Sequence, residues 1–222
     1  MDQKIRFRPD FDAWWPNYDH APETCFKFVQ RGLPDADIAA RLCQRRRVCI
    51  QAGAHAGFWP RRLAGHFTTV YAFEPEPTLF ECARANLRRW RVKNVDLRPD
   101  ALGDQAGTAV LRAHRSAGSW AIAPGLSWDS GLTDETADVE VKVTTIDALG
   151  LPVVDAIYLD VEGFETTALT GAARTIARSR PIIHLEELPD SAAAIEIHMA
   201  ALHYVRAAVA HKDVIFKPRE RS

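Results

Sequence analysis

The stretch VCIQAGAHAG, residues 48–57, constrains the fold of this chain more than any other part of it. Its first three residues are apolar and indicate a buried strand. Gly53 and Gly57 then mark a tight turn into a helix that begins near Phe58. A strand, a glycine turn and a helix together present backbone N–H groups to a nucleotide-like ligand. Two glycines at this spacing also occur at ordinary strand–helix junctions, so the stretch alone leaves both interpretations open.

A second apolar run, residues 70–73, is followed directly by an acidic residue and then by two prolines within three residues. Glu74 ends this predicted strand, roughly 20 residues after the glycine turn, where nucleotide-binding folds place a carboxylate that binds ribose hydroxyls. The alternative for Glu74 is an ordinary solvated loop carboxylate, but the paired spacing favours ribose binding. His55 stands where a dinucleotide-binding motif has its middle glycine, which disfavours a nicotinamide-dependent dehydrogenase.

The composition is that of one globular domain. The chain has 222 residues, of which 47% are hydrophobic and 26% charged, and its net charge is −1. This balance demands neither nucleic acid nor an anionic membrane as a partner. No apolar segment approaches the roughly 18 residues of a membrane span, and the N-terminus lacks the apolar core of a signal peptide. The cysteines show no metal-binding or disulfide spacing, which favours reduced thiols and a cytoplasmic location.

Predicted strands and helices alternate along the chain. Residues 1–33 are aromatic and rich in proline, and we expect an irregular segment that serves as a lid or a packing arm. Residues 34–222 should form a single domain. Apolar patterns predict strands at residues 48–50, 70–73, 95–98, 108–112, 139–143, 155–161, 181–185, 204–209 and 214–216. They predict helices at residues 34–46, 78–90, 163–176 and 191–202, besides the one that begins near residue 58.

This alternation predicts an α/β fold with a doubly wound, mostly parallel sheet. The last two strands are joined by a short polar turn, so we expect them to form an antiparallel pair at the edge of the sheet. Residues 113–138 are rich in serine, glycine and aspartate and include Trp120 and Trp128. A loop of this length inside a compact domain is usually functional or disordered, and we expect it to contact the substrate.

Five motifs, in this order, resemble those of the FkbM-type S-adenosylmethionine-dependent methyltransferases. They are IQAGAHAG at 50–57, YAFEPEP at 71–77, ALGD at 101–104, TTID at 144–147, and LDVEGFE at 159–165 followed by LTGA at 169–172. The resemblance covers about residues 48–190. It implies a Rossmann-like methyltransferase sheet and S-adenosylmethionine as the cofactor.

The resemblance also implies which residues form the site. The cofactor would be held by the glycine turn, by the ends of the second and third strands, and by one carboxylate of the fourth strand: Gln51, Gly53, Ala54, His55, Gly57, Glu74, Pro75, Asp100, Ala101 and Asp160. Asp160 and Glu162 would face the methyl group and the acceptor. Gln51 stands where the family usually has an acidic residue that binds the amino-acid end of the cofactor, and His55 stands where asparagine is common.

Methyl transfer requires the acceptor, the methyl carbon and the sulfur in line, so positioning carries much of the rate. A hydroxyl acceptor also needs a base, and the candidates at the strand ends are Asp160, Glu162, His184 and Glu186. Asp160 is favoured because it lies at the ligand edge of a doubly wound sheet. The alternatives are that Asp160 caps the following helix and that His184 is a hydrogen-bonded core residue. Three of these carboxylates could together hold Mg²⁺, but nothing in their spacing demands it, and we predict no metal.

The sequence therefore predicts an S-adenosylmethionine-dependent O-methyltransferase that acts on a hydroxyl of a sugar, a glycan or a secondary metabolite. The class of acceptor is implied by the resemblance alone. One alternative is a nucleic-acid methyltransferase whose arginine clusters at 45–47, 61–62 and 88–89 bind phosphates, although solvated helix faces explain these clusters more simply. Another is a catalytically inactive module that binds S-adenosylmethionine and a partner, which the uncharged Gln51 suggests.

Overall fold

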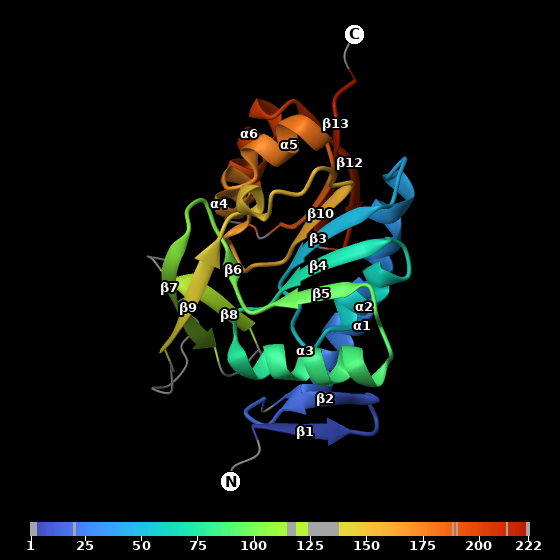
Figure 1. The fold of residues 1–222 in the computed structure, drawn as a ribbon, viewed down its shortest axis with the longest axis vertical. Helices are drawn as coiled ribbons and strands as arrows, with labels where there is room; N and C mark the ends of the chain where they lie inside the picture. Colours follow the sequence, from blue (N-terminus) through green and yellow to red (C-terminus); the bar gives the residue numbers. More distant parts are fainter. Residues whose placement is uncertain are drawn as a thin grey trace.

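The computed structural model describes residues 4–19, 21–114, 119–123, 138–187, 189, 191–211 and 213–220 (Figure 1). The strands are β1 (Ile5–Arg8), β2 (Ala13–Pro16), β3 (Val48–Ala52), β4 (Thr69–Phe73), β5 (Val95–Arg98), β6 (Ala101–Leu102), β7 (Gly107–His114), β8 (Ser119–Ala123), β9 (Asp138–Thr144), β10 (Ala156–Leu159), β11 (Ile182–Glu186), β12 (Tyr204–Ala210) and β13 (Asp213–Pro218). The helices are α1 (Pro22–Leu42), α2 (Phe58–Ala64), α3 (Pro77–Arg89), α4 (Glu165–Thr170), α5 (Ala173–Ser179) and α6 (Ala192–Ala201), with a 3₁₀ turn η1 (Ile146–Leu149).

Seven strands form the central sheet, in the order β12-β13-β11-β10-β3-β4-β5. The strands β5, β4, β3, β10 and β11 are parallel to one another, whereas β13 runs antiparallel to both β11 and β12. The predicted doubly wound sheet and its antiparallel C-terminal pair are therefore confirmed. The strand order reverses between β3 and β10, and the crevice at such a switch point is where open α/β sheets bind ligands.

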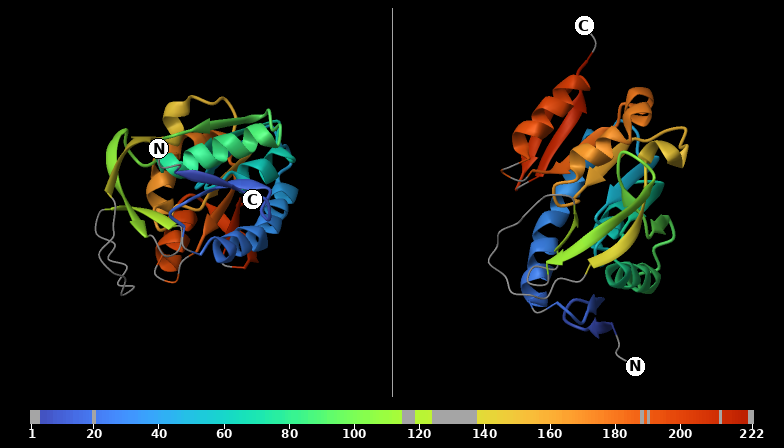
Figure 2. Two further views of the ribbon diagram at one scale, coloured as in Figure 1. Left: turned by 90° about the horizontal axis from the view of Figure 1, so that it is seen from below. Right: turned by 90° about the vertical axis from the view of Figure 1, so that its left-hand side faces the viewer.

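Helices cover both faces of this sheet (Figures 1 and 2). Because side chains alternate along a strand, successive residues of β3 belong to different cores. Ile50 packs in the core that includes Leu169 and is covered by α4, α5 and α6. Cys49 packs in the core that includes Ala39 of α1 and Leu63 of α2. None of the described helices is long and apolar enough to cross a membrane.

A smaller sheet, ordered β6-β9-β7-β8, stands beside the central one. The predicted strands at 108–112 and 139–143 are confirmed as β7 and β9, and they pair antiparallel with each other. The predicted loop at 113–138 is shorter than expected, because its first residues extend β7 and residues 119–123 form β8. The rest of that segment, and its predicted substrate contact, lies outside the described residues.

The N-terminal segment differs from the prediction. The expected irregular chain up to residue 33 contains a β1–β2 hairpin and the first half of α1, which runs without interruption through Pro34. Pro22 stands in the first turn, where its fixed φ suits a helix and its missing N–H costs nothing. Pro34 removes one helical hydrogen bond, and the packing of α1 against the sheet through buried alanines, among them Ala36 and Ala40, offsets that loss.

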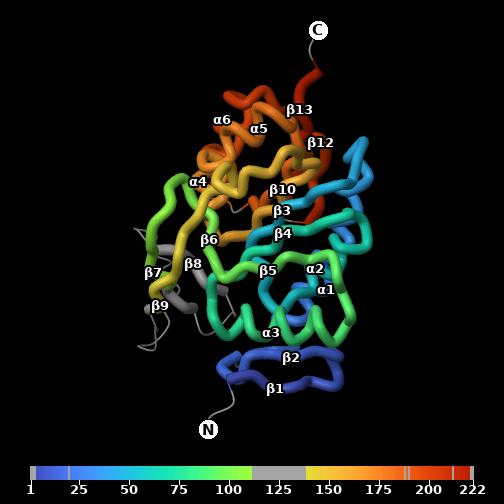
Figure 3. The backbone as a smooth tube through the Cα atoms, in the orientation of Figure 1, coloured from blue at the N-terminus to red at the C-terminus, as the bar shows by residue number. Residues whose placement is uncertain are grey.

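One buried amide joins the hairpin to α3, in addition to the ion pair between Asp12 and Arg89, and Figure 3 shows the hairpin lying along that helix. Asn86 accepts a hydrogen bond from the Trp14 backbone N–H at 2.6 Å and donates to the Trp14 carbonyl at 2.9 Å. It also donates to the carbonyl of Ala56, in the glycine turn, at 2.8 Å. Asn86 thus joins the hairpin, α3 and the glycine turn.

Replacing Asn86 by alanine should therefore destabilise the protein by about 1–3 kcal/mol, since it leaves buried backbone groups without a hydrogen-bond partner, and should loosen the hairpin. Urea unfolding measures the first effect, and hydrogen exchange of residues 5–16 measures the second. The matched control is Asn94→Ala, which removes two hydrogen bonds to the carbonyls of Ala64 and Phe67 far from the hairpin. Equal protection of the hairpin in both variants would contradict this role of Asn86.

Candidate functional site

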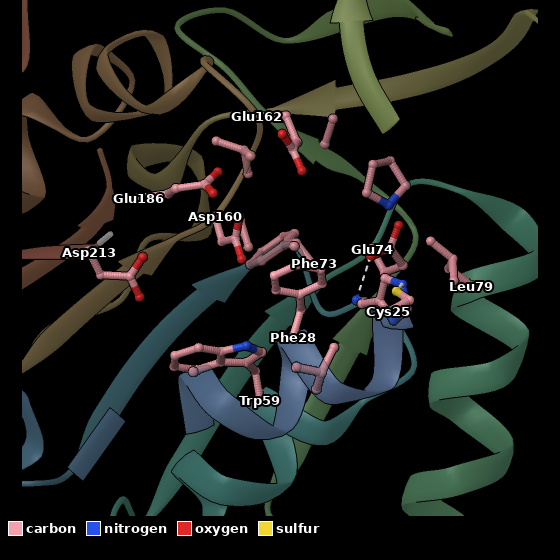
Figure 4. Close-up of a pocket in the computed structure, with 18 of the residues that line it drawn as sticks. Cys25, Phe28, Trp59, Phe73, Glu74, Leu79, Asp160, Glu162, Glu186 and Asp213 are labelled. Carbon is pink, nitrogen blue, oxygen red and sulfur yellow. Dashed lines mark hydrogen bonds between the residues drawn. The ribbon is translucent and has the colours of Figure 1, made fainter. Parts of the chain in front are cut away.

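A cavity of about 760 Å³ opens at the carboxyl ends of β3, β4, β10 and β11, next to the switch point (Figure 4). Its volume lies within the range of small-molecule and cofactor sites, which is about 300–1,000 Å³. One wall comes from α1, with Cys25 and Phe28 among its residues. The remaining walls come mainly from the strand ends and the turns that follow them, with Trp59 of α2 and Leu79 of α3. A cavity thus lies at the edge of the sheet where the sequence analysis expects a ligand.

The glycine turn brings β3 close to β10. Gly53 has a φ of +82°, and a Cβ added there would lie 2.0 Å from the carbonyl oxygen of Asp160. Gly57 has a φ of +89°, and its Cβ would lie 3.1 Å from the Cα of Ala83 in α3. Both positions require glycine, because a Cβ would clash with Asp160 at Gly53 and would crowd α3 at Gly57. Gly53 lines the cavity, whereas Gly57 allows α2 to pack against α3.

Glu74 is buried at the end of β4, and backbone N–H groups fix both of its oxygens. Its Oε2 accepts a hydrogen bond from the N–H of His55 at 2.6 Å, and its Oε1 accepts one from the N–H of Glu76 at 3.1 Å. Burial raises the pKa of Glu74 to about 7, despite these two hydrogen bonds, which act in the opposite direction. Each oxygen keeps a lone pair for a further donor, so the fixed carboxylate can receive ligand hydroxyls.

His55 forms part of the wall beside Glu74. Its φ of +48° is unusual for a residue with a side chain, and such backbone conformations concentrate at functional sites. Its ring lies 5.1 Å from that of Trp15, and its Nε2 lies 3.7 Å from the Sγ of Cys25. Burial lowers the pKa of His55 to about 4, so the imidazole is neutral at physiological pH.

Three carboxylates face the other end of the cavity (Figure 4). Asp160 follows β10, Glu162 lies in the next turn with a φ of +52°, and Glu186 ends β11. An oxygen of each lies within 4.8 Å of the others. Asp160 is accessible to solvent in the cavity, but the protein atoms that surround its carboxyl desolvate it and raise its pKa well above its ordinary value, and the charges of Glu186 and Glu162 add to this shift. Asp160 therefore favours its protonated form, in which it hydrogen-bonds with Glu186.

Carboxylates at this spacing could coordinate a divalent cation through their oxygens. Acidic side chains also cluster frequently without an ion. The absence of a metal at these three carboxylates stays a prediction.

The predicted site residues fall into two groups. Those that line the cavity are Gly53, His55, Glu74, Pro75, Asp100, Ala101, Asp160, Glu162 and Glu186. Three others lie behind its wall. Ala54 is fully buried in the core beneath α1, and Gly57 packs on α3. Gln51 donates from its Nε2 to the carbonyl of Ala52 at 3.0 Å and borders a second, much smaller cavity.

Sequence reasoning assigned no role to Glu165, although it lies inside the LDVEGFE motif. Glu165 is buried, and its Oε1 accepts hydrogen bonds from the N–H groups of Val161 at 3.1 Å and Gly163 at 3.3 Å. Burial raises its pKa to about 7. These bonds hold the turn that presents Glu162 to the cavity.

Replacing Glu165 by alanine should lower the free energy of unfolding by about 1–3 kcal/mol, because two N–H groups of the turn lose their partner. The turn should then move, and with it the Glu162 carboxylate. Urea unfolding measures the first effect, and amide exchange of Val161 and Gly163 measures the second. Glu165→Gln keeps an acceptor oxygen and should stay close to the original protein in both measurements. A glutamine variant as unstable as the alanine variant would refute this explanation.

Asp213 and Phe28 were also missed. Asp213 begins β13 and lies 2.8 Å from His184, so the expectation of a hydrogen-bonded core histidine in β11 agrees with the structure. Phe28 is 63% exposed and lines the cavity from α1. No local pattern marks either residue, because the pairing of distant segments brings them to the site.

Comparison with known proteins identifies the family. A family model described as the methyltransferase FkbM domain matches residues 51–216. An FkbM methyltransferase from Methylobacillus flagellatus KT superposes with a TM-score of 0.54 and 14% sequence identity, and the match covers 88% of this chain and 58% of that one. This chain thus spans less than two thirds of that protein. No protein with a curated description matches the sequence.

Two further solved structures share the fold. The precorrin-6y C5,15-methyltransferase of Geobacter metallireducens GS-15 has a TM-score of 0.51 and 13% identity, with 83% of this chain and 84% of that chain covered. A methyltransferase candidate from Streptococcus mutans, in complex with S-adenosylhomocysteine, has a TM-score of 0.52 and 13% identity, with 84% and 97% covered. These likenesses concern the fold alone. The family match covers most of the sequence, and the chain belongs to the FkbM methyltransferase domain family, whose cofactor is S-adenosylmethionine.

Proposed function

We propose that this protein transfers the methyl group of S-adenosylmethionine to a hydroxyl of a small molecule or a glycan. The observation that carries the proposal is that one cavity joins two kinds of polar site. A fixed, buried glutamate, Glu74, stands at one end, and the carboxylates of Asp160, Glu162 and Glu186 stand at the other. The first suits a ribose and the second suits an acceptor.

The residues present fit the cofactor. The missing side chain of Gly53 leaves the backbone open where β3 meets β10, and Glu74 has acceptor capacity for ribose hydroxyls. Asp100 and Ala101 form the wall beyond β5 and suit the adenine edge. When bound, the cofactor supplies a methyl group on a positively charged sulfur, and a wall rich in carboxylates favours a cation.

The charges of the cavity favour a neutral or cationic acceptor over a phosphorylated one. Its lining includes eight acidic residues: Asp19, Asp35, Glu74, Asp100, Asp160, Glu162, Glu186 and Asp213. Arg31 is the only lysine or arginine among the described residues that line it. Phosphate groups are recognised by lysine and arginine, so this lining disfavours nucleic acid. An exposed aromatic side chain, Phe28, in the same cavity as these carboxylates suits a polyhydroxylated ring such as a sugar.

The arginine clusters give little support to the nucleic-acid alternative. Arg47 pairs with Asp155 at 2.7 Å, and Arg89 pairs with Asp12 at 2.6 Å. Arg62 pairs with Asp37. A neighbouring carboxylate thus neutralises the charge of one arginine in each cluster. The inactive alternative rested on Gln51, whose side chain borders the small cavity and not the large one, so its lost charge does not remove a group from the large cavity.

The first test is calorimetric titration with S-adenosylmethionine and S-adenosylhomocysteine, with NAD as the control. We expect micromolar binding of the first two and none of NAD. Turnover is then measured as release of S-adenosylhomocysteine over a panel of methyl glycosides, inositol and catechol, with oligonucleotides alongside. Binding without turnover across the panel would favour the inactive module, and turnover with oligonucleotides alone would favour the nucleic-acid enzyme. Absence of binding would refute the proposal.

A further inference from the structure

A polar row crosses the central sheet beneath the acceptor end of the cavity. In the parallel register, Gln51 of β3 is the partner of Tyr158 in β10, and Tyr158 is the partner of His184 in β11. In the antiparallel register, Glu186 is opposite Asp213. Because partners in register point to the same face of a sheet, Gln51, Tyr158 and His184 form a row on that face. His184 is itself opposite Ile215, and Asp213 is its diagonal neighbour on the same face.

His184 and Asp213 are in contact on this face. The Nε2 of His184 lies 2.8 Å from the Oδ2 of Asp213. His184 is 3% exposed, so the buried imidazole lies below the cavity floor. The side chain of Asp213 is 15% exposed, and it lines the large cavity together with Asp160 and Glu186 (Figure 4). The pair therefore connects the core to the acceptor end of the site.

Two buried polar atoms, one of Gln51 and one of His184 itself, lie on the side of the imidazole away from Asp213. A second cavity of about 10 Å³ is bordered by Gln51, His184 and Asp213, among others. Within the described part of the chain, the Oε1 of Gln51 and the Nδ1 of His184 have no hydrogen-bond partner. A cavity of this size is about what one water molecule needs, provided that polar partners are present. One water that donates to both atoms would leave Nε2 as the protonated nitrogen of a neutral imidazole.

We propose that Asp213 is a further catalytic carboxylate of this site, which takes the proton of the acceptor hydroxyl, and that His184 is the residue that positions it. This proposal rests on the proposed function. In it, the Nε2–H of His184 donates to the Oδ2 of Asp213, and the Gln51 amide, through a bridging water, holds that tautomer.

The geometry favours Asp213 over Asp160 as the proton acceptor. Asp160 has carboxyl oxygens of Glu162 and Glu186 within 4.8 Å, and these like charges favour its protonated form, which cannot take a proton. Asp213 faces an N–H donor and keeps the role of a proton acceptor. As the acceptor oxygen bonds to the methyl carbon, its O–H proton passes to Asp213, and the electrons of the breaking carbon–sulfur bond move to sulfur. The step is then balanced without another reactant.

Nitrogen NMR of the imidazole rings tests the positioning half without any turnover. The protein is saturated with S-adenosylhomocysteine, and the His184 signals are assigned by their loss in His184→Gln. We expect a protonated Nε2 and an unprotonated Nδ1. A proton on Nδ1 with a bare Nε2 would overturn the proposal, because His184 could not then donate to Asp213.

Kinetics of Asp213→Asn test the catalytic half, with the best acceptor from the panel of methyl glycosides, inositol and catechol. We expect kcat to fall by roughly 10²–10⁴-fold, the usual contribution of a general base, while the affinity for S-adenosylhomocysteine changes less than twofold. Asp213→Glu should recover part of kcat. His184→Gln, which can keep an N–H donor, should lose less than Asp213→Asn. Asp104→Asn, at an exposed position outside the cavity lining, is the matched control.

The outcomes separate this proposal from the proposed function. A kcat of Asp213→Asn within threefold of the original protein overturns the catalytic role of Asp213 and leaves methyl transfer intact. An equal fall in kcat and in affinity for S-adenosylhomocysteine also overturns it, because the effect would then be structural. An original protein that binds the cofactor but methylates nothing in the panel overturns the proposed function and this proposal together.

Discussion

Replacing Gly53 by alanine should lower the affinity for S-adenosylhomocysteine by at least roughly a hundredfold, because misplacement of site groups by about 1 Å has effects of this size. The new Cβ would lie 2.0 Å from the backbone oxygen of Asp160, and a backbone atom cannot relieve the clash by a rotamer change as a flexible side chain can. The end of β10 must therefore shift, and with it Asp160. The φ of +82° adds about 1–3 kcal/mol of strain for a residue with a Cβ. Calorimetry and thermal unfolding measure the two effects.

Gly150→Ala separates these two causes. Gly150 has a φ of +63°, but a Cβ there would meet nothing within 4 Å. This variant should show the strain of the backbone conformation alone, as a small fall in the unfolding midpoint with unchanged cofactor affinity. If Gly53→Ala bound S-adenosylhomocysteine as tightly as Gly150→Ala does, the close approach of β3 and β10 would not be what shapes the site.

The central sheet was predictable because its strands are buried on both faces and read as short apolar runs. The start of α1 was not predictable, because a proline is typical of the first turn of a helix and Pro34 therefore predicts a start there. Only the packing of α1 on the sheet shows that the helix continues through Pro34. The break between α4 and α5 was missed as well. A Cβ at Gly171 would lie 2.0 Å from the carbonyl oxygen of Gly103, so the helix ends where a distant segment approaches it.

The site was predictable where its residues follow a strand directly. Glu74 and Asp160 end β4 and β10, and the fold of a doubly wound sheet brings such residues to one edge. Gln51 does not line the cavity because it lies before the end of β3, level with Tyr158 of β10, and borders the smaller cavity there. Asp213 could not be predicted, because only the antiparallel pairing of β13 with β11 sets it opposite Glu186.

The affinity for S-adenosylhomocysteine should fall as the pH is lowered below 7, by up to roughly tenfold per pH unit. Glu74 is the cause, because burial raises its pKa to about 7 in the unliganded protein. Ribose hydroxyls donate to the ionised carboxylate and lower that pKa in the complex. Below pH 7, binding must therefore expel a proton from Glu74, whereas above pH 7 the carboxylate is already ionised and the affinity levels off.

The same shift has an opposite consequence for folding. Between the ordinary pKa of 4.5 and about 7, the folded protein binds more protons at Glu74 than the unfolded chain does, so this residue favours folding less as the pH rises. Titrations in buffers of different ionisation enthalpy count the protons released on binding. Glu74→Gln keeps one acceptor oxygen and cannot titrate, so it should bind more weakly and release no proton from this position. An unchanged pH dependence in Glu74→Gln would remove Glu74 from the ribose site, because proton release would then come from another carboxylate.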